Sequence, residues 1–183
     1  YILTGTERRT VFEPHFTFHG FRYVAIDGYP ADLTLDDVAG VVIHSDMQAT
    51  GEFETSDARL NQLQHNILWG QKGNFLDVPT DCPQRDERLG WTGDAQVFCR
   101  TATFNMQVAP FFTKWLGDLS ADQAPNGSIP PFVPDFLTNG GFGMGATGWA
   151  DAGVIIPWTI YLAYGDERIL VGQYESMQAW VEY

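Results

Sequence analysis

Residues 77–96, DVPTDCPQRDERLGWTGDAQ, are the stretch around which the rest of the chain is organised. They include five carboxylates, two arginines and one tryptophan. Pro79 and Pro83 exclude a helix interior, whereas Gly90 and Gly93 permit sharp backbone turns. We therefore expect a rigid, acid-rich loop, and loops of this kind are more often functional than purely structural.

The end of this stretch indicates the start of a helix. Thr92 has a side chain typical of an N-cap, and Asp94 would then lie in the first turn, where the helix dipole favours a carboxylate. The sequence thus predicts a loop that runs directly into a helix from about residue 92 to residue 107.

The residue types in the loop suit a carbohydrate site. A glycosidase needs a protonated carboxylic acid, carboxylates that accept hydrogen bonds from sugar hydroxyls, and an aromatic face for the ring. Glu87 follows Asp86 and lies between Arg85 and Arg88, and Trp91 comes four residues later. Residue chemistry alone leaves a second interpretation open, a surface loop with local ion pairs.

The run from Asp81 to Gln96 resembles the signature of the bacterial α-L-rhamnosidases of glycoside hydrolase family 78. Four shorter motifs share the resemblance: HGFRY at 19–23, HSDM at 44–47, TGEF at 50–53 and GWAD at 148–151. The resemblance therefore spans most of the chain.

This resemblance implies hydrolysis of terminal non-reducing α-L-rhamnosides with inversion. Glu87 would be the general acid that protonates the glycosidic oxygen, and its pKa would have to be raised. The general base of the family is a Glu in a later part of the barrel, so we expect it after residue 183 and expect residues 1–183 alone to be inactive. Asp135 and Asp151 are the only local substitutes.

The expected substrate-binding residues are Asp81, Arg85, Trp91, Asp94, Trp149 and Asp151. Asp81 and Asp94 would accept hydrogen bonds from ring hydroxyls, and Arg85 would donate to a hydroxyl or orient a carboxylate. Trp91 would pack against the C5 methyl group of the sugar. Three structural alternatives stay open: Asp94 as a helix cap, Arg85 as a neutralising charge, and Asp151 as a helix-start carboxylate.

The composition narrows the possible partners. A formal net charge of −13 argues against nucleic acid or an anionic membrane, because both select for basic surfaces. The four histidines and two cysteines form no metal-ligand pattern, so we expect no metal and no cofactor. No stretch reaches transmembrane length. Because the sequence begins at Tyr1 without Met, the cellular compartment stays open, with a slight preference for the cytoplasm. The oligomeric state also stays open.

Residues 1–55 have the pattern of β structure. Aromatic and β-branched residues alternate at 16–19 and 21–26, and an apolar run follows at 38–44. We expect these to be the last strands of a β-sandwich domain that begins before Tyr1, as the resemblance also implies.

From residue 56 onward, the apolar residues have the spacing of amphipathic helices. Helices are expected from a Ser56 cap to Gly70, over 92–107, from Pro110, over 149–164 with a kink at Pro157, and at the chain end, with a loop over 123–148. The expected apolar faces include Leu60 and Leu63; Val97 and Phe104; Phe111, Phe112, Trp115, Leu116 and Leu119; and Leu170, Tyr174, Met177 and Val181. The resemblance implies that residues 56–183 are the N-terminal part of an (α/α)6 barrel, a six-hairpin toroid.

Two other functions stay open. The chain could belong to a related α/α-barrel enzyme that acts on a different sugar, which activity screening on several glycosides would reveal. It could also be a non-catalytic sugar-binding or structural fragment, which would bind rhamnose without turnover.

Overall fold

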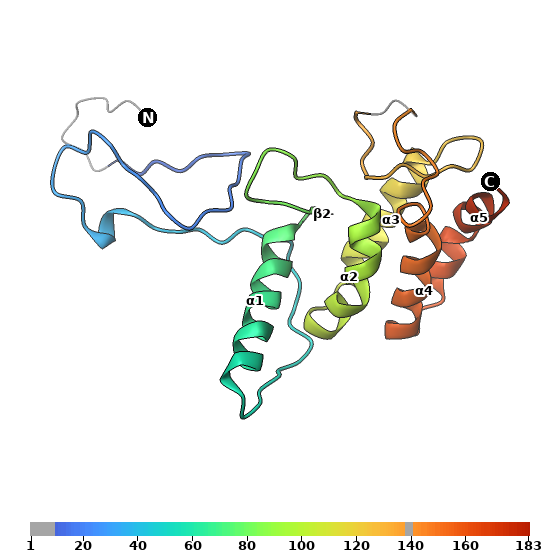
Figure 1. Cartoon of the computed structure of the whole chain (residues 1–183), viewed down its shortest axis with the longest axis horizontal. Helices are drawn as coiled ribbons and strands as arrows, with labels where there is room; N and C mark the ends of the chain where they lie inside the picture. Colours follow the sequence, from blue (N-terminus) through green and yellow to red (C-terminus); the bar gives the residue numbers. More distant parts are fainter. Residues whose placement is uncertain (1–9, 138–140) are drawn as a thin grey trace.

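The computed structural model describes residues 10–137 and 141–183, and this part of the chain is mainly helical (Figure 1). Its five α-helices are α1 (Ala58–Asn74), α2 (Thr92–Asn105), α3 (Ala109–Asp122), α4 (Ala152–Tyr164) and α5 (Arg168–Glu182). A short 3-10 helix, η1 (Leu35–Asp37), precedes them. Strands β1 (Phe75–Leu76) and β2 (Val78–Pro79) form a small antiparallel pair between α1 and α2.

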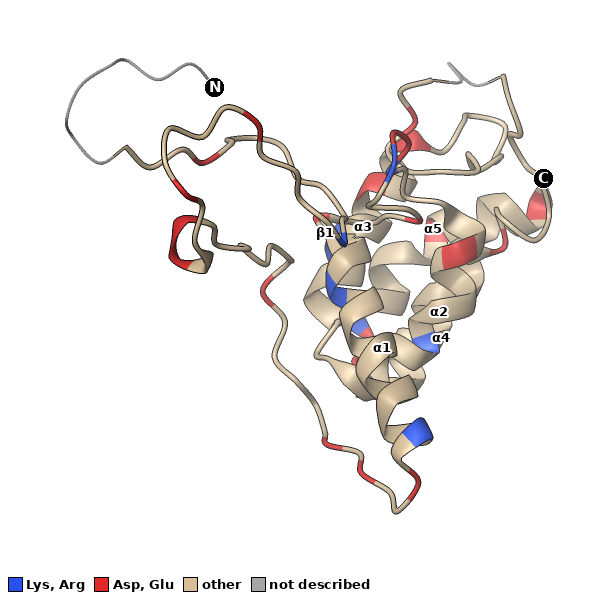
Figure 2. Cartoon of the chain, turned by 60° about the vertical axis from the view of Figure 1, so that its left-hand side comes forward, with Lys and Arg blue, Asp and Glu red and all other residues tan. Residues whose placement is uncertain are grey.

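The strands predicted at 16–19, 21–26 and 38–44 are not formed. Residues 10–57 are an extended arm that reaches away from the helices in Figure 1 before returning along α1, and none of them belongs to a strand. A strand needs a neighbour for its backbone hydrogen bonds, and the arm has no sheet beside it among the described residues. Phe16, with φ 57°, also interrupts the extended geometry. Acidic residues are spread along the arm (Figure 2).

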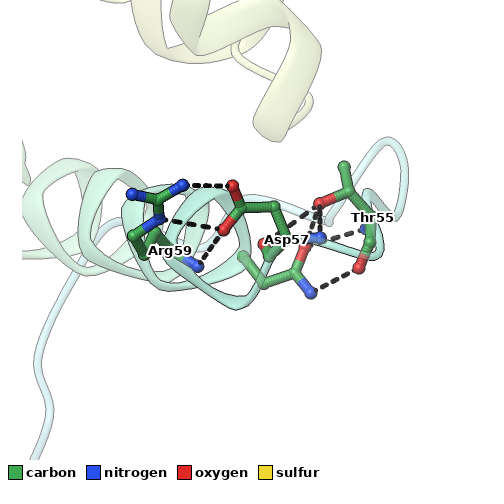
Figure 3. Close-up of polar contacts among 4 residues, drawn as sticks. Thr55, Asp57 and Arg59 are labelled. Atoms are coloured by element: carbon green, nitrogen blue, oxygen red, sulfur yellow. Dashed lines mark hydrogen bonds and ion pairs between the residues drawn. The ribbon is translucent and has the colours of Figure 1, made fainter.

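Helix α1 begins one residue later and ends four residues later than predicted. Its N-cap is Asp57 rather than Ser56, because Asp57 Oδ1 accepts a hydrogen bond of 2.9 Å from the Arg59 backbone N–H (Figure 3). Leu60 and Leu63, expected on its apolar face, are exposed. The helix is tied to α2 instead by the buried Gln71, whose Oε1 accepts a hydrogen bond of 2.9 Å from Asn105 Nδ2.

Helix α2 also differs in its cap and its buried face. The N-cap is Trp91, and Thr92 is the first helical residue, fully buried with its hydroxyl donating to the Pro131 carbonyl at 2.9 Å. Val97 and Phe104, expected in the core, are exposed. The face that packs on α4 is made of small residues, Ala95, Cys99 and Ala102.

Helix α3 agrees with the prediction in its start and its face. Pro110 lies in the first turn, where a missing N–H leaves no carbonyl unpaired. The five predicted apolar residues are all buried: Phe111, Phe112, Trp115, Leu116 and Leu119. The Phe75 ring of β1 stacks on Phe111 with centroids 4.5 Å apart, which joins the strand pair to this core.

Helices α4 and α5 complete the core. Pro157 lies inside α4, as predicted, and Gly165 ends that helix with φ 68°, the left-handed geometry of a C-cap. The buried face of α5 was predicted one residue too late. It consists of Ile169, Gln173, Ser176 and Trp180, whereas Tyr174 and Val181 are exposed.

The segment 123–151 has no helix or strand in its described part, as predicted for 123–148. Residues 138–140 of that predicted loop, which include Asn139 and Gly140, lie outside the described residues. Phe132 is buried, and its ring meets Trp91 edge to face at 5.3 Å, so the segment covers the end of the acid-rich loop. None of the described helices is long and apolar enough to cross a membrane.

Candidate active site

The acid-rich loop, residues 80–90, connects β2 to α2 and is fixed at its C-terminal end by the segment 131–133. The Val133 N–H donates to the Gly90 carbonyl at 2.9 Å, and the Thr92 N–H donates to the Pro131 carbonyl at 2.9 Å. A Cβ atom on Gly90 would collide with the Val133 carbonyl, so only glycine permits this approach. The backbone that leads into Trp91 and α2 is therefore rigid.

Glu87 is held by two donors from its own loop. The Trp91 indole Nε1–H donates to Glu87 Oε1 at 2.9 Å, and Arg85 Nη2 lies 2.9 Å from Glu87 Oε2. The same Arg85 nitrogen is 3.9 Å from Asp81 Oδ2. The structure thus brings together Asp81, Arg85, Glu87 and Trp91.

These donors lower the pKa of Glu87 below its ordinary value. The Trp91 hydrogen bond is the largest cause. Desolvation, the next largest, opposes it, and the contact with Asp81 and the Arg85 charge add smaller lowering effects. The raised pKa expected for a general acid is therefore absent from this arrangement. Asp86, the neighbouring carboxylate, points into solvent and pairs with Arg88 at 3.1 Å.

The pKa of Asp94 is shifted in the opposite direction, above its ordinary value. Partial burial raises the pKa of Asp94, and the negative charges of Asp81 and Glu87 raise it further. Asp94 lies in the first turn of α2, and a hydrogen bond from its own backbone N–H opposes the rise in its pKa. The Glu87 and Asp94 carboxyl groups therefore have pKa values shifted in opposite directions.

A cleft of about 550 Å³ opens beside these residues, between α1, α2 and the turn before α4. Asp81, Asp94 and Trp149 line it, together with apolar side chains such as Phe98. Asp81 Oδ1 is buried and has no hydrogen-bond partner within the described chain, so it can accept one from a ligand hydroxyl. Carboxylate oxygens thus lie next to an apolar wall in this cleft.

Trp149 is placed in the cleft by a glycine on α2. A Cβ atom on Gly93 would lie 3.0 Å from Trp149 Cδ1 and 3.2 Å from the Gly148 carbonyl oxygen. Gln96 Nε2 donates to the same carbonyl at 2.7 Å. The first two turns of α2 therefore fix the position of the indole.

Asp151 belongs to the scaffold of this site. Its Oδ1 accepts a hydrogen bond of 3.2 Å from Trp180 Nε1, and its Oδ2 accepts one of 3.0 Å from the Gly148 N–H. Both carboxylate oxygens are thus used to join α5 to the turn before α4. Of the predicted site residues, Asp81, Asp94 and Trp149 line the cleft, whereas Arg85, Glu87, Trp91 and Asp151 are not among its lining residues.

Asn74 also belongs to the cleft, although it was not among the predicted site residues. It is the last residue of α1 and lines the cleft, and its buried Oδ1 has no partner within the described chain. An asparagine at a helix end normally suggests only a cap, and no motif singles it out. Its place beside Asp81 comes from the β1–β2 hairpin, which was not predicted.

One group of side chains has atoms close enough to surround a cation. Single ligand atoms of Asp81, Cys82 and Glu87 lie within 4.8 Å of one another. Arg85 already supplies a positive charge to both carboxylates of this group. We therefore assign no metal to these residues.

Comparison with known families defines the class of protein. The family model described as the bacterial alpha-L-rhamnosidase 6 hairpin glycosidase domain matches residues 48–183. A second model, the bacterial alpha-L-rhamnosidase concanavalin-like domain, matches residues 1–44. The helical part is thus a six-hairpin glycosidase domain, which confirms the predicted fold class. The chain belongs to the bacterial α-L-rhamnosidase family.

Individual relatives agree with this assignment. An alpha-L-rhamnosidase of Streptomyces avermitilis is 49% identical over 100% of this chain. The match covers 17% of that protein's own length. One from Formosa agariphila is 48% identical and also covers 100% of this chain, with 20% of its own length matched.

The solved structures give the same result for the fold. The Streptomyces avermitilis enzyme, crystallised with L-rhamnose, superposes with a TM-score of 0.90 at 49% identity, over 94% of this chain and 16% of its own. The alpha-L-rhamnosidase from Dictyoglumus thermophilum superposes with a TM-score of 0.89 at 43% identity, over 93% of this chain and 19% of its own. The chain thus spans a fifth or less of the length of these relatives.

Proposed function

We propose that the full-length protein hydrolyses terminal non-reducing α-L-rhamnosides with inversion, and that Glu87 is its general acid. The observation that carries the proposal is the Glu87 carboxylate, which Trp91 and Arg85 hold beside Asp81, a residue that lines the cleft. The family membership and the likeness to an enzyme crystallised with L-rhamnose support rhamnose as the sugar.

A proton must reach Glu87 before it can act. In the geometry described above, Arg85 favours the charged form of Glu87. The Arg85 side chain is 62% exposed, and its Nη2 already lies 3.9 Å from Asp81. We propose that a bound sugar draws Arg85 toward Asp81 or toward a ring hydroxyl. Glu87 would then lose an ion pair, and its pKa would rise toward the range that a general acid needs.

The cleft supplies the binding groups. Asp81 and Asp94 would accept hydrogen bonds from ring hydroxyls, and Trp149 would offer an apolar face. Because the indole N–H of Trp91 is used by Glu87, only the ring of Trp91 is available for the C5 methyl of rhamnose. A buried methyl contact contributes roughly 1 kcal/mol.

Inversion requires a second carboxylate, about 6.5–9.5 Å from the acid, that activates water on the opposite face of the sugar. Asp151 is a poor candidate, because Trp180 and Gly148 occupy both of its oxygens. We therefore propose that the base is supplied from outside residues 1–183.

The test is hydrolysis of a panel of aryl glycosides by the full-length protein, with the product anomer identified by NMR during the first minutes. The proposal expects turnover of the α-L-rhamnoside in preference to the α-D-mannoside, with β-L-rhamnose as the first product. Preferential turnover of another glycoside would instead support the enzyme of different sugar specificity. Rhamnose binding without any turnover would support the non-catalytic alternative.

A further inference from the structure

The N-terminal arm touches the acid-rich loop at one small place. Among residues 10–43, Phe18 and Gly20 are the two that are not exposed, and both lie against the loop. These two residues belong to the part matched by the concanavalin-like domain, whereas the loop belongs to the six-hairpin part. The contact therefore crosses from one family domain to the other.

Arg88 makes the first half of this contact. Its Nη1 donates to the Phe18 carbonyl at 2.7 Å, and its guanidinium carbon lies 5.4 Å from the centre of the Phe18 ring. Its Nη2 donates to Asp86 Oδ1 at 3.1 Å. A planar guanidinium can make all three contacts at once, which the compact ammonium of lysine cannot.

The backbone makes the second half. The Gly20 N–H donates to the Pro83 carbonyl at 3.1 Å, and a Cβ atom on Gly20 would lie 3.0 Å from Gln84 Cα. The arm thus fixes both sides of the turn that presents Arg85 and Glu87. Within the described chain this turn has no helix or strand of its own.

The backbone of Arg88 is itself in an unusual state. Its φ of 54° lies in the left-handed region, which a long side chain rarely adopts and which glycine would enter without strain. Such strain persists where surrounding contacts determine the conformation, and it is common at functional sites. Here the contacts with Phe18 and Asp86 hold the residue that directly follows Glu87.

We propose that Arg88 is a positioning residue, through which the N-terminal domain holds the loop so that Glu87 points toward the glycosidic oxygen. This inference rests on the proposed function, because it takes Glu87 as the general acid. Without the contact, the exposed turn would sample other conformations, and misplacement of a catalytic group by about 1 Å can cost on the order of 10²-fold in rate.

The test compares Arg88→Ala with Arg59→Ala in the full-length protein. Arg59 is a matched control, because it pairs with an aspartate two residues earlier, as Arg88 does, but at the exposed start of α1 (Figure 3). Arg88→Ala should lower kcat at least about tenfold on a rhamnoside with a poor leaving group. It should lose less on a nitrophenyl rhamnoside, which needs less protonation, and KM should stay near the wild-type value. Arg88→Lys should recover part of the loss, and Arg59→Ala should behave like wild type.

A second pair of variants reaches the loop from the other side and changes no charge. Gly20→Ala would push on Gln84 and should give the same leaving-group dependence, whereas Gly40→Ala has open space around it and should have no effect. If Arg88→Ala does not fold, the comparison of Gly20→Ala with Gly40→Ala alone tests the positioning role. Wild-type kinetics, or an equal loss on both substrates, would overturn the inference.

Glu87→Gln, assayed alongside, separates this inference from the proposed function. If Glu87→Gln shows the leaving-group dependence of an acid variant while Arg88→Ala and Gly20→Ala do not, only the positioning role fails. If Glu87→Gln itself shows no such dependence, the proposed function fails and the positioning role fails with it.

Discussion

The indole N–H of Trp91 donates a hydrogen bond of 2.9 Å to Glu87 Oε1, across four residues of the loop. The Trp91 ring is in turn fixed against Phe132 with centroids 5.3 Å apart. A buried aromatic residue of the segment 123–151 therefore determines, through Trp91, where the Glu87 carboxylate lies.

Trp91→Phe should move the pH profile of the enzyme. The indole hydrogen bond is the largest cause of the lowered pKa of Glu87, so its loss should raise that pKa. A general acid is active only while protonated, and kcat/KM falls as pH rises through the pKa of the acid in the free enzyme. The alkaline limb of kcat/KM should therefore move to higher pH.

The measurement is kcat/KM against pH on an aryl α-L-rhamnoside, with Trp69→Phe as the control. Trp69 lies on α1 and contacts Lys72 and His65, away from Glu87. An alkaline limb that stays in place, or moves to lower pH, would show that the hydrogen bond does not set the pKa of the acid.

Gly93→Ala should weaken substrate binding more than it slows the chemical step. The added methyl group would meet Trp149 at 3.0 Å and push its indole away from the position it occupies in the cleft. KM should rise several-fold, by an amount consistent with the loss of part of an apolar contact worth about 1 kcal/mol. The control is Gly117→Ala on α3, where a methyl group meets nothing within 4 Å.

Steady-state kinetics of the two alanine variants would decide the role of Trp149. An unchanged KM for Gly93→Ala, in a protein of normal thermal stability, would show that the Trp149 indole does not contact the sugar.

Asp151→Ala should lower stability. It would leave the buried Trp180 indole without its acceptor, and an unsatisfied buried donor costs about 1–3 kcal/mol, whereas the Gly148 N–H is exposed and can bond to water. Asp151→Asn keeps an acceptor oxygen for one of the two donors and should lose less. Thermal unfolding of both variants in the full-length protein is the measurement. A large rise in KM with no fall in Tm would return Asp151 to the list of sugar-binding residues.

The sequence predicted the acid-rich loop and α3 well for identifiable reasons. Proline and glycine act through the local backbone, so Pro83, Gly90 and Pro110 place a loop and a helix start without knowledge of the rest of the fold. The Glu87–Trp91 contact is also local, since it joins residues four positions apart.

Long-range packing explains the errors. The α5 sequence has apolar residues on two adjacent faces, and the choice between Ile169 and Leu170 depends on how α5 lies against α3 and α4. On α2, small residues such as Ala102 are buried because α4 approaches closely, while Phe104 stays exposed. The lowered pKa of Glu87 could not be predicted, because it depends on the directions in which the Trp91 and Arg85 side chains point, and the spacing of residues does not determine these directions.

The most direct test of the account compares Glu87→Gln with the wild-type full-length protein on two α-L-rhamnosides, one with a poor leaving group and one with nitrophenol. Because glutamine cannot donate the required proton, we expect kcat to fall on the order of 10²–10⁴-fold on the poor leaving group and much less on the nitrophenyl substrate. Equal losses on both substrates, or full activity on the poor one, would contradict the assignment of Glu87 as the general acid.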